Sequence, residues 1–172
     1  MPKDSAKVTG PMATGLGVAI GQCSLAGRKP ENQDAHGAHV PEGEALVLKG
    51  ITLAIADGIS SSAVSGQAAR TAVNALLSDY YATPETWSAK TAARRVILAT
   101  NAWLHGRNAQ GADVNAGQVC TLTALILKGR EGHILHVGDS RVQRLAGQSL
   151  EPLTTDHRVV LSPDESYLGR AM

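Results

Sequence analysis

The sequence predicts an α+β fold, in which helices pack on antiparallel sheets. Three observations indicate this fold: strand-like segments come first, two segments of helical periodicity follow, and a series of short strands with nearby glycines comes last. Strands and helices thus occur in separate runs, unlike the alternation that is typical of a parallel sheet. The 172 residues suit one domain with a substantial core, and neither repeats nor a linker indicate a second domain.

The first strands are expected in the N-terminal third. Residues 1–14 are predicted to be a flexible lead-in, and residues 15–172 to form the domain. Residues 16–25, LGVAIGQCSL, alternate well enough for a strand, and residues 34–40 could form a second. Residues 51–56, ITLAIA, are the clearest third strand, because the run is apolar and ends at the turn signal Asp57-Gly58.

Two helices are expected next. Apolar residues recur at helical spacing in residues 62–81, and again along a segment that Pro84-Glu85 would open in the favoured first-turn position. Gly106 is predicted to end the second helix, and residues 106–118 to form a loop.

The last part of the chain is predicted to be mostly short strands. Residues 119–127, 133–139, 141–146 and 148–154 suit an antiparallel meander. Residues 162–172, SPDESYLGRAM, look like the start of a helix, and the chain then stops. A truncated domain is therefore expected.

Composition narrows the class of protein. The net charge of +1 gives no reason to expect nucleic acid as a partner. The N-terminus is a poor signal peptide and no apolar run reaches the length of a membrane span, so a cytoplasmic protein is expected by default. Cys23 and Cys120 are interpreted as two buried thiols, and one disulfide stays open as the alternative.

Two further patterns are not favoured. GLGVAIG, residues 15–21, superficially matches a dinucleotide-binding glycine pattern, but nothing strand-like precedes it. The pairs His36/His39 and His133/His136 lack the downstream ligands that a zinc site needs.

Three aspartates are predicted to lie at strand ends, where a sheet would hold them rigidly. Asp34 starts a strand after a polar loop, whereas Asp57 and Asp139 each follow a strand. Taken singly, each is explained as a turn or cap residue. With Arg28 in the preceding loop they form a more specific set, because magnesium and manganese bind carboxylate oxygens and arginine offers a planar fork to phosphate. The residues alone therefore raise the hypothesis of metal-assisted phosphate chemistry.

Five short motifs carry a resemblance to a known family. They are Arg28 with Asn32-Gln33-Asp34-Ala35, Ala56-Asp57-Gly58, Thr121-Leu122-Thr123-Ala124, Val137-Gly138-Asp139-Ser140-Arg141, and Leu153-Thr154-Thr155-Asp156-His157. In this order and spacing they resemble the metal-dependent protein serine/threonine phosphatases of type 2C, most of all the bacterial members. The resemblance runs from about Leu16 to the last residue.

The resemblance implies a fold and a site. The family fold is a four-layer α-β-β-α sandwich of two antiparallel sheets flanked by helices, here incomplete at the C-terminus. The family binds two manganese or magnesium ions, which activate a bridging water for attack on phosphoserine or phosphothreonine, and some members bind a third, weaker ion. By position, Asp34, Asp57 and the Gly58 carbonyl would bind metal, Arg28 would hold the substrate phosphate, and Asp139 would help to bind the third ion.

The sequence departs from the family pattern at three places. Ile59 stands where many members have a histidine proposed to protonate the leaving group, so a water or the weak donors Ser60 to Ser62 would have to serve. Gln33 stands where many have glutamate. Relatives also continue beyond the segment that matches residues 168–172 and supply two further metal-binding aspartates, which this chain lacks.

Because of these departures, more than one function stays open. The leading hypothesis is metal-dependent hydrolysis of phosphoserine and phosphothreonine in proteins, although this chain alone need not be active. The alternative is a non-catalytic module of the same fold that binds phosphoprotein or a regulatory partner, and a third option is a hydrolase of small phosphoesters. The expected partners are a phosphorylated protein and a cognate serine/threonine kinase, separate or fused, with no nucleic acid and no membrane.

Overall fold

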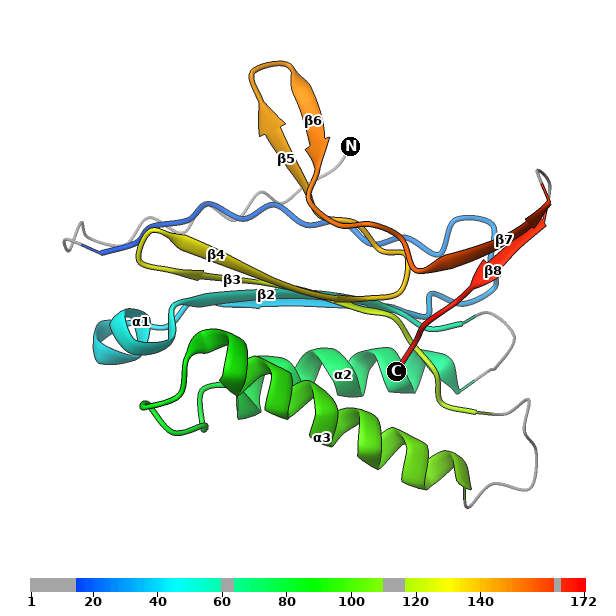
Figure 1. The fold of residues 1–172 in the computed structure, drawn as a ribbon, viewed down its shortest axis with the longest axis horizontal. Helices are drawn as coiled ribbons and strands as arrows, with labels where there is room; N and C mark the ends of the chain where they lie inside the picture. Colours follow the sequence, from blue (N-terminus) through cyan, green and yellow to red (C-terminus); the bar gives the residue numbers. More distant parts are fainter. Residues whose placement is uncertain (1–14, 60–63, 110–116, 163–164) are drawn as a thin grey trace.

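The computed structural model describes residues 15–59, 64–109, 117–162 and 165–172, and it confirms the α+β fold of antiparallel sheets with flanking helices (Figure 1). The lead-in predicted for residues 1–14 lies outside the described residues. In chain order the elements are β1 (Asp34–His39), α1 (Gly43–Lys49), β2 (Ile51–Asp57), α2 (Ser65–Asp79), α3 (Ala89–Ala109), β3 (Leu122–Lys128), β4 (Glu131–Val137), β5 (Gln143–Ala146), β6 (Ser149–Pro152), β7 (Arg158–Ser162) and β8 (Glu165–Leu168).

One antiparallel sheet of four strands organises the molecule. Its strand order is β1-β2-β3-β4, and the hairpins β5–β6 and β7–β8 form two separate two-stranded sheets. α2 packs against β1 and β2, whereas α3 contacts α2 and β4, so both long helices cover the same face of the sheet (Figure 1). The N-terminal segment and the hairpins β5–β6 and β7–β8 lie on the other side of the sheet (Figure 1).

Small residues let α2 lie close to the sheet. A Cβ atom on Gly37 of β1 would lie 2.6 Å from Leu77 Cδ1 of α2, so this part of β1 faces the helix. The buried cluster between sheet and helix is rich in alanine: Ala54, Ala56, Ala68, Ala69 and Ala72. Since side chains alternate along a strand, the neighbours of these positions on β1 and β2 point to the opposite face. Asp34 and Asp57, the aspartates expected to bind metal, belong to this opposite face.

Three expectations for the chain ends and helix bounds were wrong. Residues 16–25 form no strand, because no segment among the described residues pairs with them. The helix-like residues 162–172 instead supply β8, which pairs with β7 and places Val159 opposite Tyr167. α3 begins at Ala89, where the Thr91 N–H donates to Ser88 Oγ at 3.2 Å, and continues through Gly106 to Ala109.

Most of the strands and the first long helix are confirmed. The strands expected at 34–40 and 51–56 are β1 and β2, and the helix expected within 62–81 contains α2. β3, β4, β5 and β6 lie within or overlap the predicted strand segments, whereas α1 was not foreseen. Within the part of the chain that the structure describes, no helix has the length and apolar character needed to cross a membrane.

Candidate functional site

Asp34 and Asp57 lie directly opposite each other at one end of the sheet. Asp34 is the first residue of β1, Asp57 is the last of β2, and the antiparallel register pairs the two. Both side chains belong to the sheet face turned away from α2, because Ala35 and Ala56, the next pair in the ladder, lie against the helix-side core. Two carboxylates 23 positions apart in sequence are thus brought to one place by a single strand pairing.

A hollow of about 490 Å³ lies over this carboxylate pair. Its walls come from the N-terminal segment 21–25, from the ends of β1 and β2, and from Ser140 after β4. Cys23 lines it and is exposed, whereas Cys120 is buried, and both thiols are free. The expectation of two buried thiols was therefore wrong for Cys23, since the segment that carries it lies on the surface.

The carboxyl group of Asp57 has a shifted pKa. Burial raises the pKa of the Asp57 carboxyl above its ordinary value, and hydrogen bonding to the Asp34 side chain and its negative charge raise it further. Lys29 acts in the opposite direction, and Asp139 adds to the rise. Two carboxylates that share one site cannot both ionise without cost unless a proton or a cation lies between them.

An unpaired oxygen on Asp57 fits a cation. Asp57 Oδ1 is buried without a hydrogen-bond partner, although buried polar atoms in proteins are nearly always paired. Magnesium and manganese are commonly held by one or two carboxylates with several waters, and the Asp34–Asp57 pair can supply two. Among the described residues, no group of three or more histidine, cysteine, aspartate or glutamate side chains forms a denser site.

The end of β2 is fixed by Thr121, the residue just before the neighbouring strand β3. The Asp57 N–H donates to Thr121 Oγ1 at 2.9 Å, and the Thr121 N–H donates to the Asp57 carbonyl at 2.8 Å. Thr121 is 1% exposed, and its hydroxyl also lies 3.1 Å from Ser140 Oγ, in the wall of the hollow. A buried hydroxyl thus connects the backbone of the candidate ligand to the hollow.

Gly58 brings the end of β2 against the start of α2. A Cβ atom at this position would lie 2.5 Å from the Ser65 carbonyl carbon, so no other residue fits without displacing the helix. The Gly58 N–H donates to the Gln33 carbonyl at 3.2 Å, and Gly58 forms a bridge with Cys120. These contacts fix the backbone beside Asp57; a role of the Gly58 carbonyl as a ligand stays a prediction.

Asp139 acts on Asp57 through its charge, but its side chain is hydrogen-bonded to Arg158. Its Oδ2 accepts a hydrogen bond from Arg158 Nη1 of β7 at 2.7 Å, and its charge contributes to the raised pKa of Asp57. Arg158 also donates to Ser166 Oγ of β8 at 3.0 Å. The β7–β8 hairpin therefore holds the carboxylate that was assigned by sequence to a third metal.

Arg28 lies in an exposed turn after Gly27 and is not among the residues that line the hollow. The cation that does act on Asp57 is its neighbour Lys29. Sequence reasoning missed Lys29, because nothing in a polar loop shows which of two adjacent cations points to the site. Asn32, two residues before β1 begins, has a structural role: its side-chain oxygen accepts a hydrogen bond from the Asp34 N–H at 3.0 Å.

Two histidines that sequence reasoning left without a role attach the segment after β6 to the sheet. The rings of His136 and His157 stack with centroids 4.8 Å apart. The Gly138 N–H donates to His157 Nδ1 at 3.2 Å, so the ring carries its proton on Nε2. His136 contacts Thr123 Oγ1 at 2.8 Å through Nδ1. These contacts hold the turn that carries Asp139; Ser60 to Ser62, the donors considered by sequence, lie outside the described residues.

The family of the chain follows from a comparison with family models. The family model of protein phosphatase 2C matches residues 24–162. No curated protein sequence matches the chain.

Three solved structures illustrate the fold. The serine/threonine phosphatase Stp1 from Staphylococcus aureus has a TM-score of 0.68 at 21% identity, covering 88% of this chain and 59% of that protein. PppA, described as a key regulatory component of T6SS in Pseudomonas aeruginosa, has 0.61 at 26%, covering 83% and 60%. The PPM Ser-Thr phosphatase MsPP from Mycobacterium smegmatis, in complex with cacodylate, has 0.58 at 23%, covering 76% and 49%. The chain thus spans about half to three fifths of these proteins.

Proposed function

This chain belongs to the protein phosphatase 2C family, and we propose that it serves the metal-dependent hydrolysis of phosphoserine and phosphothreonine in proteins. The observation that carries the proposal is the pairing of Asp34 with Asp57 at the strand ends, together with the buried and unpaired Asp57 Oδ1. Such a pair has unsatisfied negative charge directed at a hollow, which is what a divalent cation neutralises.

Asp34 and Asp57 would hold manganese or magnesium, with the Gly58 carbonyl as a further ligand and Asp139 beside a weaker third ion. When two such ions are bound, they lower the pKa of a shared water and neutralise charge on the phosphoryl oxygens. The family likeness supports this assignment, and the raised pKa of Asp57 supports it physically, because a group that resists bearing a charge alone gains from a cation.

The chain's own residues would hold and orient the reacting groups. Thr121 fixes the Asp57 backbone by two hydrogen bonds, which hold the base of the carboxylate side chain in place. Arg28 would bind two phosphate oxygens of the substrate through its guanidinium. Lys29 adds positive charge that acts on Asp57. Phosphoryl transfer depends mainly on positioning and electrostatics, so no side-chain nucleophile is needed.

Proton delivery to the leaving group is not supplied by residue 59. Ile59 has no ionisable group, and its N–H donates to the Val119 carbonyl at 3.2 Å, so it serves the backbone only. A solvent water, or one of the weak donors Ser60 to Ser62, would have to protonate the leaving serine or threonine oxygen. This assignment predicts a weak dependence of turnover on any single protein acid.

The natural substrate would be a phosphorylated protein, and a serine/threonine kinase, separate or fused, would supply it. A phosphoprotein must be made before it can be hydrolysed, which fits a signalling role. PppA, the relative described as regulatory, supports such a context. The sequence features that argue against nucleic acid, such as the net charge of +1, agree with this proposal.

The test is manganese-dependent release of phosphate from a phosphothreonine peptide by the 172-residue chain. Asp57→Asn should abolish turnover and weaken manganese binding measured by calorimetry, while Asp79→Asn, at the far end of α2, should leave both unchanged. Manganese binding without turnover would overturn catalysis by this chain and favour the non-catalytic phosphoprotein-binding module. Turnover that is equal in Asp57→Asn would overturn the assigned site.

A further inference from the structure

Within the part of the chain that the structure describes, the outer edge of β4 has no strand partner. β4 is the last strand in the order β1-β2-β3-β4, and among the described residues no backbone hydrogen bond reaches Glu131–Val137 from the side opposite β3. Only the residue after β4 is covered, since the Gly138 carbonyl accepts from the His157 N–H at 2.8 Å. An uncovered edge presents backbone donors and acceptors to which another strand can bind.

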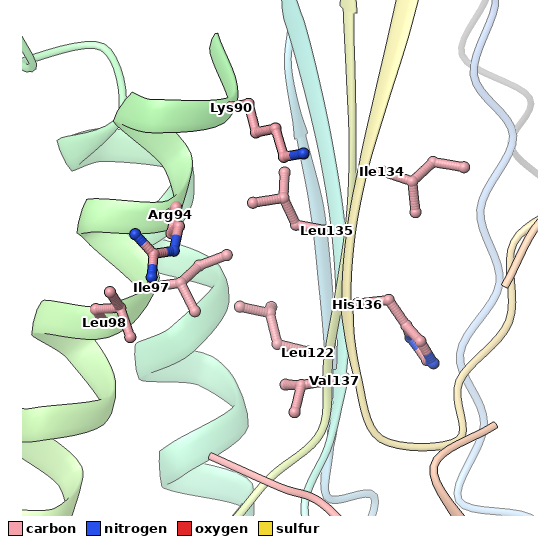
Figure 2. A pocket seen from close by; sticks show the side chains of 9 residues that line it. All are labelled: Lys90, Arg94, Ile97, Leu98, Leu122, Ile134, Leu135, His136 and Val137. Carbon is pink, nitrogen blue, oxygen red and sulfur yellow. The ribbon is translucent and has the colours of Figure 1, made fainter. Parts of the chain in front are cut away.

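A groove of about 280 Å³ lies between this edge and α3 (Figure 2). Leu122, Leu135 and Val137 point from the sheet toward the helix, while Ile134 and His136 point away from it (Figure 2). From the helix side, Ile97 and Leu98 complete an apolar lining, and Leu98 is 50% exposed. The groove can therefore hold aliphatic side chains of a strand added to β4.

The helix side of the groove carries two basic residues. Lys90 and Arg94 are exposed, lie one helical turn apart, and form no ion pair within the described part of the chain. By contrast, the neighbouring Arg95 lies over the Trp87 ring at 4.6 Å. Glu131 is at the start of β4, and its Oε2 lies 3.5 Å from His133 Nε2.

The spacing of these cations suits a strand. Residues four apart on a helix lie about 6 Å from each other along its axis. Alternate residues of a strand, which share one face, lie about 6.8 Å apart. Two acidic side chains at alternate positions of an added strand could therefore reach Lys90 and Arg94 together.

We propose that the edge of β4 and its groove bind an extended acidic and aliphatic segment of another protein, which adds a fifth strand to the sheet. The backbone of that segment pairs with β4, its acidic side chains meet Lys90 and Arg94, and its aliphatic side chains enter between Ile97, Leu98 and Val137. This mode of recognition obtains affinity from the backbone and specificity from alternate side chains. The inference is independent of the proposed phosphatase activity.

The probe is a fluorescein-labelled nine-residue peptide in which two glutamates and then two valines occupy alternate positions, with threonine between them. The reversed peptide tests the other strand direction. A control peptide of equal composition places the glutamates and valines on opposite faces. Fluorescence anisotropy should show binding of one patterned peptide at least on the order of tenfold tighter than the control, and hydrogen exchange should show new protection of amides in β4.

Matched variants locate the contact. The double substitution Lys90→Glu with Arg94→Glu should weaken binding by on the order of tenfold, because two favourable charge pairs become repulsive. Arg95→Glu makes the same change of charge as each single substitution, next to Arg94 but outside the groove, and should leave binding within twofold. Circular dichroism melts of each variant verify that the fold is retained.

Three results would overturn the proposal. The first is equal affinity for the patterned and control peptides. The second is binding without added protection in β4, which would indicate only electrostatic attraction to α3. The third is a concentration-dependent dimer in sedimentation that the double variant abolishes, because a second copy of this chain would then occupy the edge.

Discussion

The hydroxyl of Thr121, the residue before β3, accepts a hydrogen bond from the backbone N–H of Asp57 at 2.9 Å. This contact crosses from a buried threonine to the last residue of β2, at the point where regular strand pairing ends. The same hydroxyl lies 3.1 Å from Ser140 Oγ. Asp57 is therefore held by its backbone, which leaves its carboxylate to face the hollow.

Replacing Thr121 by valine should release the end of β2. The Asp57 N–H would lose its partner in a buried place, which costs about 1–3 kcal/mol of unfolding free energy. Urea denaturation measures the loss, and hydrogen exchange should show faster exchange of the Asp57 amide. Thr121→Ser keeps the hydroxyl and should keep that amide protected. Equal protection in both variants would contradict the contact.

Replacing Asp57 by asparagine should change the pH dependence of stability in the absence of divalent metal. Because the pKa of Asp57 is raised above 3.8 in the folded state, the folded chain binds this proton more tightly than the unfolded chain does. Stability of the wild-type chain should then fall as pH rises from about 3.8 through the raised pKa. Asp57→Asn should remove this fall.

Urea denaturation in EDTA between pH 4 and 8 measures the effect. Asp79→Asn, which changes an exposed aspartate at the end of α2, is the control and should retain the fall. Addition of manganese should also remove the fall in the wild-type chain, since a bound cation favours the ionised pair. A pH profile of Asp57→Asn identical to wild type would disprove the role assigned to this carboxyl.

Gly138 should tolerate no side chain. Its φ is 117°, and a Cβ atom there would lie 2.5 Å from Thr121 Cβ, so Gly138→Ala adds backbone strain and a clash. The expected loss is about 3 kcal/mol. Gly147 also has a positive φ, 62°, but no atom lies within 4 Å of its Cβ position, so Gly147→Ala should cost only about 1 kcal/mol. Equal losses in denaturation would show that the contact with Thr121 is unimportant.

Strands and helices with a strong local pattern could be predicted from the sequence. Residues 51–56 are mostly apolar and end at a turn signal, and α2 has a regular stripe that includes Val73 and Leu76, so each pattern determines its element locally. The segment 16–25 has a similar strand pattern yet forms no strand, because a strand also needs a partner for its backbone. The β7–β8 hairpin was missed for the converse reason. Its sequence has no clear strand pattern, and the two segments are extended because they pair with each other.

The candidate site, too, could be predicted from the sequence only in part. That Asp34 and Asp57 lie at strand ends could be read from the turn signals beside them. That they face each other depends on the register of β1 on β2, which the sequence does not contain in any short segment. The choice between Arg28 and Lys29 depends on the conformation of one loop, and the contact of Asp139 with Arg158 depends on a hairpin 19 residues away. Local sequence patterns therefore predict which residues lie at strand ends, whereas the pairing of strands determines which side chains lie next to them.

The two cysteines should differ strongly in reactivity. Burial raises the pKa of the Cys120 thiol to about 12, whereas Cys23 is exposed in the wall of the hollow. Ellman's reagent should therefore label one thiol rapidly in the native chain and two after denaturation. Cys23→Ser should abolish the native reaction, and Cys120→Ser should leave it unchanged. Rapid labelling of Cys120 would show that the core around β3 opens readily.

Lys49 should contribute to stability although it is a buried cation. It is 5% exposed, and its Nζ donates to the Thr83 carbonyl at 2.7 Å, to Thr83 Oγ1 at 2.8 Å and to the Pro84 carbonyl at 3.2 Å. These bonds attach the end of α1 to the loop between α2 and α3. Lys49→Met keeps the apolar stem but leaves these acceptors unpaired, so it should lower the unfolding free energy by about 3 kcal/mol.

Lys90→Met is the matched control for this change. Lys90 is exposed on α3, so the same substitution there should alter stability by less than about 0.5 kcal/mol. Denaturation curves of both variants give the comparison. If Lys49→Met were as stable as wild type, the hydrogen bonds of the ammonium group would do no more than offset the cost of removing it from water. A loss confined to Lys49→Met would show instead that the buried ammonium holds α1 to the helical layer.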